Sequence, residues 1–182
     1  KAIQEAIDKY DNIYVPQGWY RITETLKMKP DTKLIGLHPF GTQFRLDEST
    51  AAFSGFGGPK AMVESSEGGA NMLMGIGINT GGYNYRAVGV KWMANADSYM
   101  NDVKFVGGHG GLWKPKPGVE EPRGRWNRPA RISSPDNPVA ASGMDLAWDN
   151  QYWSLWVTNN GGGTFKDIWT ASTYATDRKS VV

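Results

Sequence analysis

The sequence predicts an all-β fold in which short parallel strands stack as the coils of a β-helix, with a helix covering the first coil. Three observations lead to this prediction: an apolar pattern of helical period at the start of the chain, closely spaced β segments after it, and an internal repeat further on. A chain of 182 residues is the right size for one domain of this kind.

Residues 1–10 are predicted to form a capping helix. Ile3, Ala6 and Ile7 recur at helical spacing, which places them on one face. The open end of a stacked β structure exposes unpaired backbone groups and apolar core. A helix with one apolar face covers both, so we expect this helix to close the first coil.

Short β segments follow the helix, with apolar and polar residues in alternation. Turn residues separate them, first Pro16-Gln17-Gly18 and then Pro30-Asp31. The predicted strands cover residues 13–15, 20–22, 26–28 and 34–35. Their brevity and close spacing are typical of stacked coils rather than of a broad sheet.

An internal repeat supports the same architecture. Residues 90–103 align without gaps on residues 155–168, an offset of 65 residues. Each copy has an apolar strand, a small polar turn, an aspartate and a second apolar strand. We expect the two aspartates, Asp102 and Asp167, to be turn or strand-entry residues. An offset this long predicts either several coils or an inserted loop between the copies.

Residues 107–143 are predicted to be a long loop inserted into a coil. The segment is rich in Gly, Pro, Arg and Trp, and its prolines exclude regular strands from most of it. Long loops on a rigid scaffold often carry binding surfaces, whereas the alternative is an insertion without order. Trp113 and Trp126 favour an ordered loop, and we expect His109 and Trp113 to contribute to substrate binding.

The two ends of the chain lead us to expect a piece of a longer protein. Lys1 falls inside the first helix, and the last six residues, DRKSVV, resemble the translation of a sequencing adapter. We therefore expect residues 1–176 to be an incomplete single β-helix domain and residues 177–182 to be a non-native tail. A secretory signal peptide is expected upstream.

Composition excludes several classes of function. The formal net charge is +2 with no basic stripe, which argues against a nucleic-acid partner. No apolar run is long enough to span a membrane. Cysteine is absent and no His or acidic residues stand at metal-ligand spacing, so we expect neither a metal nor another cofactor.

The segment 145–153, DLAWDNQYW, is the densest candidate site. It places Asp145 and Asp149 among Trp148, Tyr152 and Trp153. Flat aromatic side chains cover the apolar face of a sugar ring while acids and amides hydrogen-bond its hydroxyl groups, so the segment predicts carbohydrate contact. The alternative is that the tryptophans pack under the long loop and the aspartates make turn hydrogen bonds.

Glycoside hydrolysis requires one protonated and one ionised carboxyl group. Asp145 and Asp149 are the predicted catalytic pair, and the other acids to test are Glu64, Glu67 and Asp97. Arg86 and Lys91 are candidates for a lyase base or for binding an acidic sugar, with a solvated side chain as the alternative reading of each.

Residues 2–8, 13–22 and 26–36 together resemble the N-terminal signature of the pectate lyase superfamily, which implies a right-handed parallel β-helix of the pectin lyase type. Residues 89–111 and 153–170 resemble bacterial proteins near glycoside hydrolase family 55, whose members cleave β-1,3-glucans. That family builds its cleft between two β-helical halves, and this chain resembles the first, so the isolated chain is expected to be inactive.

These observations predict a fragment of a secreted, cell-surface or periplasmic enzyme that degrades polysaccharides. The leading hypothesis is a glycoside hydrolase that acts on a glucan-like polymer through paired carboxylates. The alternatives are a lyase acting on a uronate polymer and a non-catalytic β-helix that binds glycans, as in phage tails or adhesion proteins. The expected partner is a polysaccharide or oligosaccharide.

Overall fold

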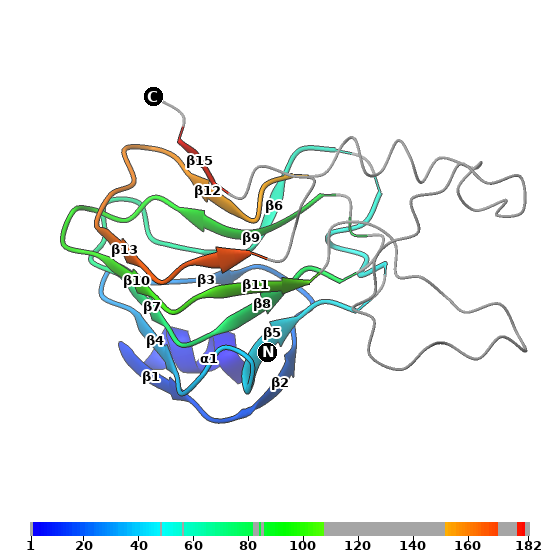
Figure 1. The fold of residues 1–182 in the computed structure, drawn as a ribbon, viewed down its shortest axis with the longest axis horizontal. Helices are drawn as coiled ribbons and strands as arrows, with labels where there is room; N and C mark the ends of the chain where they lie inside the picture. The colour runs from blue at the N-terminus through cyan, green and yellow to red at the C-terminus, as the bar shows by residue number, and fades with distance from the viewer. Residues whose placement is uncertain are drawn as a thin grey trace, which may run out of the picture.

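In a computed structural model, the described part of the chain forms fifteen short strands and one N-terminal helix (Figure 1). The structure describes residues 2–47, 49–55, 57–81, 84, 86–107, 152–170 and 178–180. The strands form three parallel five-stranded sheets, which we call A, B and C. Within each sheet every strand pairs with the strand three places earlier or later in the chain, so the chain runs through A, B and C in the same order five times.

The three sheets have the following members. Sheet A contains β1 Asn12–Val15, β4 Lys33–Gly36, β7 Met72–Met74, β10 Tyr99–Asn101 and β13 Thr164–Lys166. Sheet B contains β2 Gly18–Arg21, β5 Thr42–Arg45, β8 Gly77–Asn79, β11 Lys104–Gly107 and β14 Trp169–Thr170. Sheet C contains β3 Leu26–Lys27, β6 Lys60–Glu64, β9 Ala87–Trp92, β12 Leu155–Val157 and β15 Arg178–Ser180.

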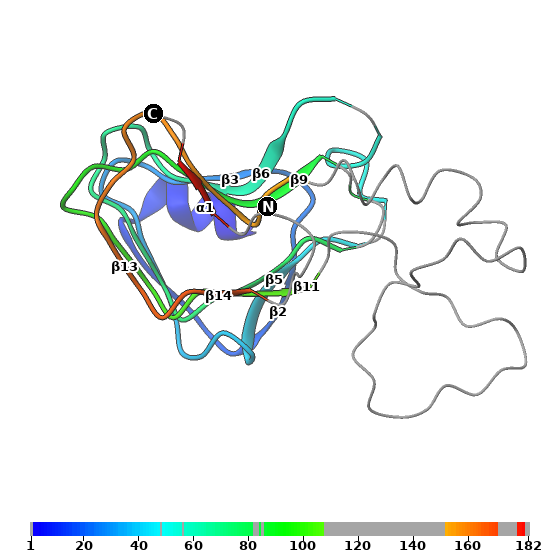
Figure 2. The same cartoon turned by 45° about the horizontal axis from the view of Figure 1, so that its top comes forward.

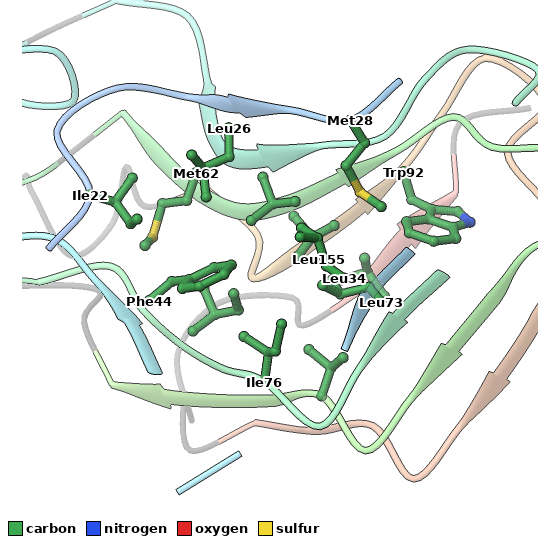
Figure 3. Close-up of a cluster of buried hydrophobic side chains, with 14 of the residues drawn as sticks. Ile22, Leu26, Met28, Leu34, Phe44, Met62, Leu73, Ile76, Trp92 and Leu155 are labelled. Carbon is green, nitrogen blue, oxygen red and sulfur yellow. The ribbon is translucent and has the colours of Figure 1, made fainter. Parts of the chain in front are cut away.

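The sheets are the walls of one apolar interior (Figure 2). Because side chains alternate along a strand, every second residue points inward, and the pairing register aligns these residues into rows. One such row crosses sheet A: Ile13, Leu34, Leu73, Met100 and Phe165. Figure 3 shows side chains from all three sheets meeting in the interior, among them Leu34, Phe44 and Leu155.

The helix α1, Ala2–Lys9, lies at the end of the stack that carries β1 to β3 (Figure 1). Ile7 is fully buried in the core and Ile3 packs against it. The Gln4 side chain takes the place of a further strand beside β3, since its Nε2 donates to the Lys27 carbonyl at 3.1 Å and its Oε1 accepts from the Lys27 amide at 2.8 Å. The predicted N-terminal helix is therefore confirmed, and it satisfies backbone groups at a sheet edge.

The predicted early strands are confirmed with small shifts in their boundaries. β2 begins at Gly18 instead of residue 20, because the Gly18 amide already donates to the Gly41 carbonyl of the next pass at 2.9 Å. The internal repeat also corresponds to real neighbours. Leu155 pairs with Val90 and Phe165 pairs with Met100, so the two copies occupy adjacent strands in register.

The long offset of the repeat reflects one extended connection. Val63 of β6 pairs with Val90 of β9, which is 27 residues later in the chain. Val90 in turn pairs with Leu155 of β12, which is 65 residues later. The additional residues fall between β11 and β12. Most of the predicted loop insertion, 107–143, belongs to this connection and lies outside the described residues. Residues 178–180, within the segment expected to be a non-native tail, pair as β15 with β12.

The turn from sheet A to sheet B has a repeated backbone conformation. Gly75, Asp102 and Asp167 follow β7, β10 and β13, and their φ angles are 65°, 50° and 52°. This left-handed conformation is open to glycine and tolerated best by Asn and Asp among other residues. The turn role predicted for the two aspartates is thus confirmed.

Candidate site on the outer face of sheet C

The outer face of sheet C carries one row of functional side chains. The register aligns Lys27 of β3, Glu64 of β6, Lys91 of β9 and Trp156 of β12. Their neighbours Leu26, Val63, Val90 and Leu155 form the parallel inward row and are buried in the core. Because neighbouring strands are about 4.8 Å apart, the outward row brings together residues that are far apart in the sequence.

Three aromatic rings adjoin this row at β12, and we call Tyr152, Trp153 and Trp156 the sheet C aromatic group. The ring centres of Tyr152 and Trp153 are 5.9 Å apart, and those of Trp153 and Trp156 are 5.8 Å apart. The interplanar angles are 67° and 52°, so the rings meet edge to face or tilted. All three residues are half-buried, which leaves part of each ring open to a ligand.

Lys91 connects the aromatic group to the acid of the same row. Its Nζ lies 5.2 Å from the centre of the Trp156 ring and 3.8 Å from the Glu64 carboxylate. The side chains of Lys91 and Glu64 are only 23% and 31% exposed, so the pair is less screened than an ordinary surface ion pair. A cation, a carboxylate and an indole ring therefore stand side by side on three adjacent strands.

The segment that connects β5 of sheet B to β6 of sheet C forms hydrogen bonds at the border of this site. The Tyr152 hydroxyl donates to the Gly57 carbonyl at 2.9 Å, and the Arg86 Nε donates to the Gly58 carbonyl at 3.0 Å. These glycines lie in the segment between β5 and β6, which projects from the stack in Figures 1 and 2. The backbone of that segment thus positions Tyr152 and Arg86 beside the outer face of sheet C.

The indole nitrogen of Trp156 is a hydrogen-bond donor without an acceptor in the described structure. Its Nε1 is buried and has no hydrogen-bond partner among the protein atoms of the described residues. A buried donor left without an acceptor costs about 1–3 kcal/mol, and a buried water molecule would remove that cost. The site can thus donate hydrogen bonds from Lys91 while its rings stack against a ligand.

The structure places some of the predicted site residues in this group. Tyr152 and Trp153 belong to it, and Glu64, Lys91 and Arg86 join them from β6, β9 and the residue before β9. The predicted catalytic pair, Asp145 and Asp149, lies outside the described residues, as do the predicted sugar-binding residues Trp148, His109 and Trp113.

Two further candidate acids stand apart from the sheet C site. Glu67 is exposed in the turn after β6, and Asp97 is exposed in the turn after β9, where its amide donates to Asn95 Oδ1 at 2.9 Å. Both turns lead from sheet C to sheet A, on the side away from the segment that carries Gly57. These acids fit the role of solvated turn residues.

Trp156 is the site residue that sequence reasoning missed. A usable signal was present, because the 65-residue repeat aligns Trp156 with Lys91, just as it aligns Leu155 with Val90. If the aligned copies are treated as neighbouring strands, the repeat by itself puts the indole beside the lysine.

Two other features bear on the class of the site. Among the described residues, no three His, Cys, Asp or Glu side chains converge where a metal ion could bind. In the same part of the chain, no helix has the length and apolar character needed to cross a membrane. The chemistry of the site formed by Glu64, Lys91 and the sheet C aromatic group consists of aromatic stacking, the Lys91–Glu64 ion pair and hydrogen-bond donors.

Comparison of the chain with protein-family models, with curated proteins and with solved structures finds no match.

Proposed function

We propose that this protein binds an extended polysaccharide across the outer face of sheet C, as part of a secreted glycan-degrading enzyme. The observation that carries the proposal is the contact series Tyr152–Trp153–Trp156–Lys91–Glu64, with each neighbouring pair in contact. Aromatic rings supply the stacking surface for the C–H faces of sugars, and the charged groups of Lys91 and Glu64 supply directed bonds to hydroxyl groups.

We propose a right-handed parallel β-helix of the pectin lyase type as the architecture that carries this site. The pairing of every strand with the third strand along the chain supports it, as does the ordered passage through three sheets. Right-handed crossovers are the rule for parallel strands within a sheet, which supports the handedness. A stack of this kind presents each outward row as a straight line of side chains, a shape suited to a linear polymer.

Glycoside hydrolysis by paired carboxylates is the reaction we propose for the enzyme. Glu64 supplies one carboxylate within the sheet C site, 3.8 Å from Lys91. The second is proposed to come from Asp145 or Asp149, in the connection that joins β11 to the aromatic group at β12. One carboxyl group would protonate the leaving oxygen while the other acts as nucleophile or activates water.

Lyase action on a uronate polymer is the second candidate, because cations are close to the aromatic group. Lys91 contacts Trp156, and Arg86 and Tyr152 bond to adjacent carbonyls of one loop. A cation near the sugar carboxylate would support removal of the neighbouring proton. The two reactions leave different products, since both create a new reducing end but only elimination also creates a C4=C5 double bond in the uronate.

The first test measures binding to laminarin and to polygalacturonate by affinity electrophoresis of the 182-residue chain and its variants. Trp156→Ala and Lys91→Ala are expected to weaken binding about tenfold, because each removes one contact of roughly 1.4 kcal/mol. Tyr14→Ala is the matched control, because Tyr14 is 58% exposed on the outer face of sheet A. Equal binding by all three variants would contradict the proposed site.

The second test concerns catalysis and uses a longer protein that contains this chain. Glu64→Gln, Asp145→Asn and Asp149→Asn are assayed for new reducing ends and for the ultraviolet absorbance of unsaturated products. Hydrolysis predicts that the unaltered protein forms new reducing ends without unsaturated products, and that the variants lose these ends while binding is retained. Unsaturated products that disappear in Lys91→Ala would establish the lyase instead, and binding without either product would establish a non-catalytic glycan-binding protein.

A further inference from the structure

The outer face of sheet B carries a second row of exposed aromatic side chains. The register aligns Trp19, Gln43, Gly77, Lys104 and Trp169 across all five strands of the sheet. The two tryptophans at the ends are 69% and 43% exposed. Four strand spacings separate them, about 19 Å along the stack.

A loop adds a third ring between these two tryptophans. The segment between β4 and β5 folds over the outer face of sheet B, where the Pro39 carbonyl occupies the place that a side chain at Gly77 would fill. The Gln43 side chain fixes the loop through a 3.0 Å hydrogen bond to the Phe40 carbonyl. The Phe40 ring is 44% exposed, and its centre lies 6.1 Å from that of Trp169.

These rings account for much of the exposed apolar surface in the described part of the chain. Six large apolar side chains are exposed there, and four of them belong to sheet B or its loop: Trp19, Leu37, Phe40 and Trp169. Exposed aromatic rings aligned along one face offer separate stacking positions for a ligand. Sheet B is thus a second candidate surface, separate from the site on sheet C.

The charges on this face indicate what it binds. The Arg45 guanidinium lies over the Trp19 ring, 4.3 Å from its centre. Its neighbour Arg21 is engaged by Asp47 at 2.6 Å, and Lys104 is engaged by Asp102 at 3.0 Å, whereas no acid of the described residues pairs with Arg45. Within the described residues, one cation is therefore held against an exposed indole without a carboxylate partner, an arrangement suited to an anionic ligand.

We propose that the outer face of sheet B binds an anionic polysaccharide. A sugar ring stacks on Trp19 with its acidic group on Arg45, and a later part of the same polymer stacks on Phe40 and Trp169. The row geometry favours a linear polymer over a protein partner, because Trp19 and Trp169 stand at the two ends of a row about 19 Å long instead of forming one continuous apolar patch. The inference rests on the proposed function only in taking a polysaccharide as the ligand.

The test measures the affinity of the full 182-residue chain for alginate, dextran sulfate and neutral dextran. Trp19→Ala and Arg45→Gln are expected to weaken binding to the anionic polymers about tenfold each, and Trp169→Ala somewhat less. Added salt should weaken wild-type binding more than that of Arg45→Gln. Binding that is stronger for alginate identifies a carboxylate as the anionic group, and stronger binding of dextran sulfate identifies a sulfate ester.

Two controls separate this inference from the proposed function. Tyr14→Ala removes an exposed ring from sheet A and should leave all affinities unchanged, and Trp156→Ala alters only the sheet C site. If the sheet C variants bind normally while Trp19→Ala and Arg45→Gln do not, the proposed function fails and the sheet B inference holds. Unchanged binding of anionic polymers by Trp19→Ala and Arg45→Gln would overturn the inference, as would a dimer in solution that Trp19→Ala converts to monomer.

Discussion

The outer faces of sheets B and C obey the same register rule yet present their aromatic rings differently. On sheet C the rings are half-buried and contact each other, and Tyr152 is bonded to the loop that carries Gly57. On sheet B the rings of Trp19 and Trp169 are separated by four strand spacings and are 69% and 43% exposed. Strand pairing aligns both rows, so the difference arises from the segments that border each face.

In a stack of this kind, the loops rather than the strands distinguish one outer face from another as a binding surface. The strands are short and share one core, so they supply a regular array of outward positions with little variation. The loops beside each sheet then determine how exposed each outward side chain is. On sheet C the side chains of Lys91 and Glu64 are only 23% and 31% exposed, and the segment that carries Gly57 bonds to Tyr152 at the border of this face. On sheet B the short loop at Phe40 is held over the strands by Gln43.

Removal of a core side chain that the sheets share should destabilise the whole stack, including both outer faces. Trp92 is fully buried, donates from Nε1 to the Gly162 carbonyl at 2.9 Å and meets the Phe165 ring at 6.0 Å. Trp92→Ala should lower the free energy of unfolding by about 3–5 kcal/mol, measured by urea denaturation, because it leaves a large cavity and an unpaired carbonyl. Trp169→Ala, which removes an exposed indole, should change the same quantity by less than about 0.5 kcal/mol.

Equal effects of these two tryptophan substitutions would contradict a single core shared by the three sheets. The prediction depends on Trp92 belonging to sheet C while it packs against Phe165 of sheet A. A large loss confined to Trp92→Ala would establish that the walls of the stack are stabilised together. The two outer faces would then be supported by the same apolar core, and they would differ only in their outward side chains and loops.

A smaller change should disturb sheet B alone. A side chain at Gly77 would collide with the Pro39 carbonyl, so Gly77→Val must displace the loop that carries Phe40. We expect a loss of about 1–3 kcal/mol in thermal or urea denaturation, the usual cost of forced overpacking. Gly58→Ala is the matched control, because nothing lies within 4 Å of the added Cβ. If Gly77→Val left stability and the binding of anionic polymers unchanged, the loop would not be part of the sheet B surface.

Much of the fold was predictable from local sequence patterns. The alternation of apolar residues and the turns at Pro16 and Pro30 place the first strands within two residues of their observed limits. The repeat identifies β9 and β12 as neighbours because both copies keep the same spacing. These features are local or periodic, and local sterics and side-chain alternation determine them.

The two surfaces were harder to predict because they depend on pairing offsets that vary. Trp19 pairs with Gln43, and Gln43 pairs with Gly77, across connections of unequal length. No fixed period relates Trp19 to Trp169, so their common row appears only when every register is known. On sheet C only half of the site, Lys91 beside Trp156, is encoded by the repeat, and Glu64 joins through a different offset.

The smallest expected effect sharpens the contrast between a sheltered and an exposed ring. Trp156→Ala should lower the free energy of unfolding by about 1–2 kcal/mol, because the half-buried indole contacts both Trp153 and Lys91. Trp19→Ala should stay within about 0.5 kcal/mol, because its ring is 69% exposed. Trp156→Phe should be neutral or slightly stabilising, since phenylalanine keeps a ring while it removes the buried N–H that has no acceptor in the described structure. Urea denaturation of the three variants measures these differences, and a clear loss of stability in Trp156→Phe would mean that the N–H already has an acceptor.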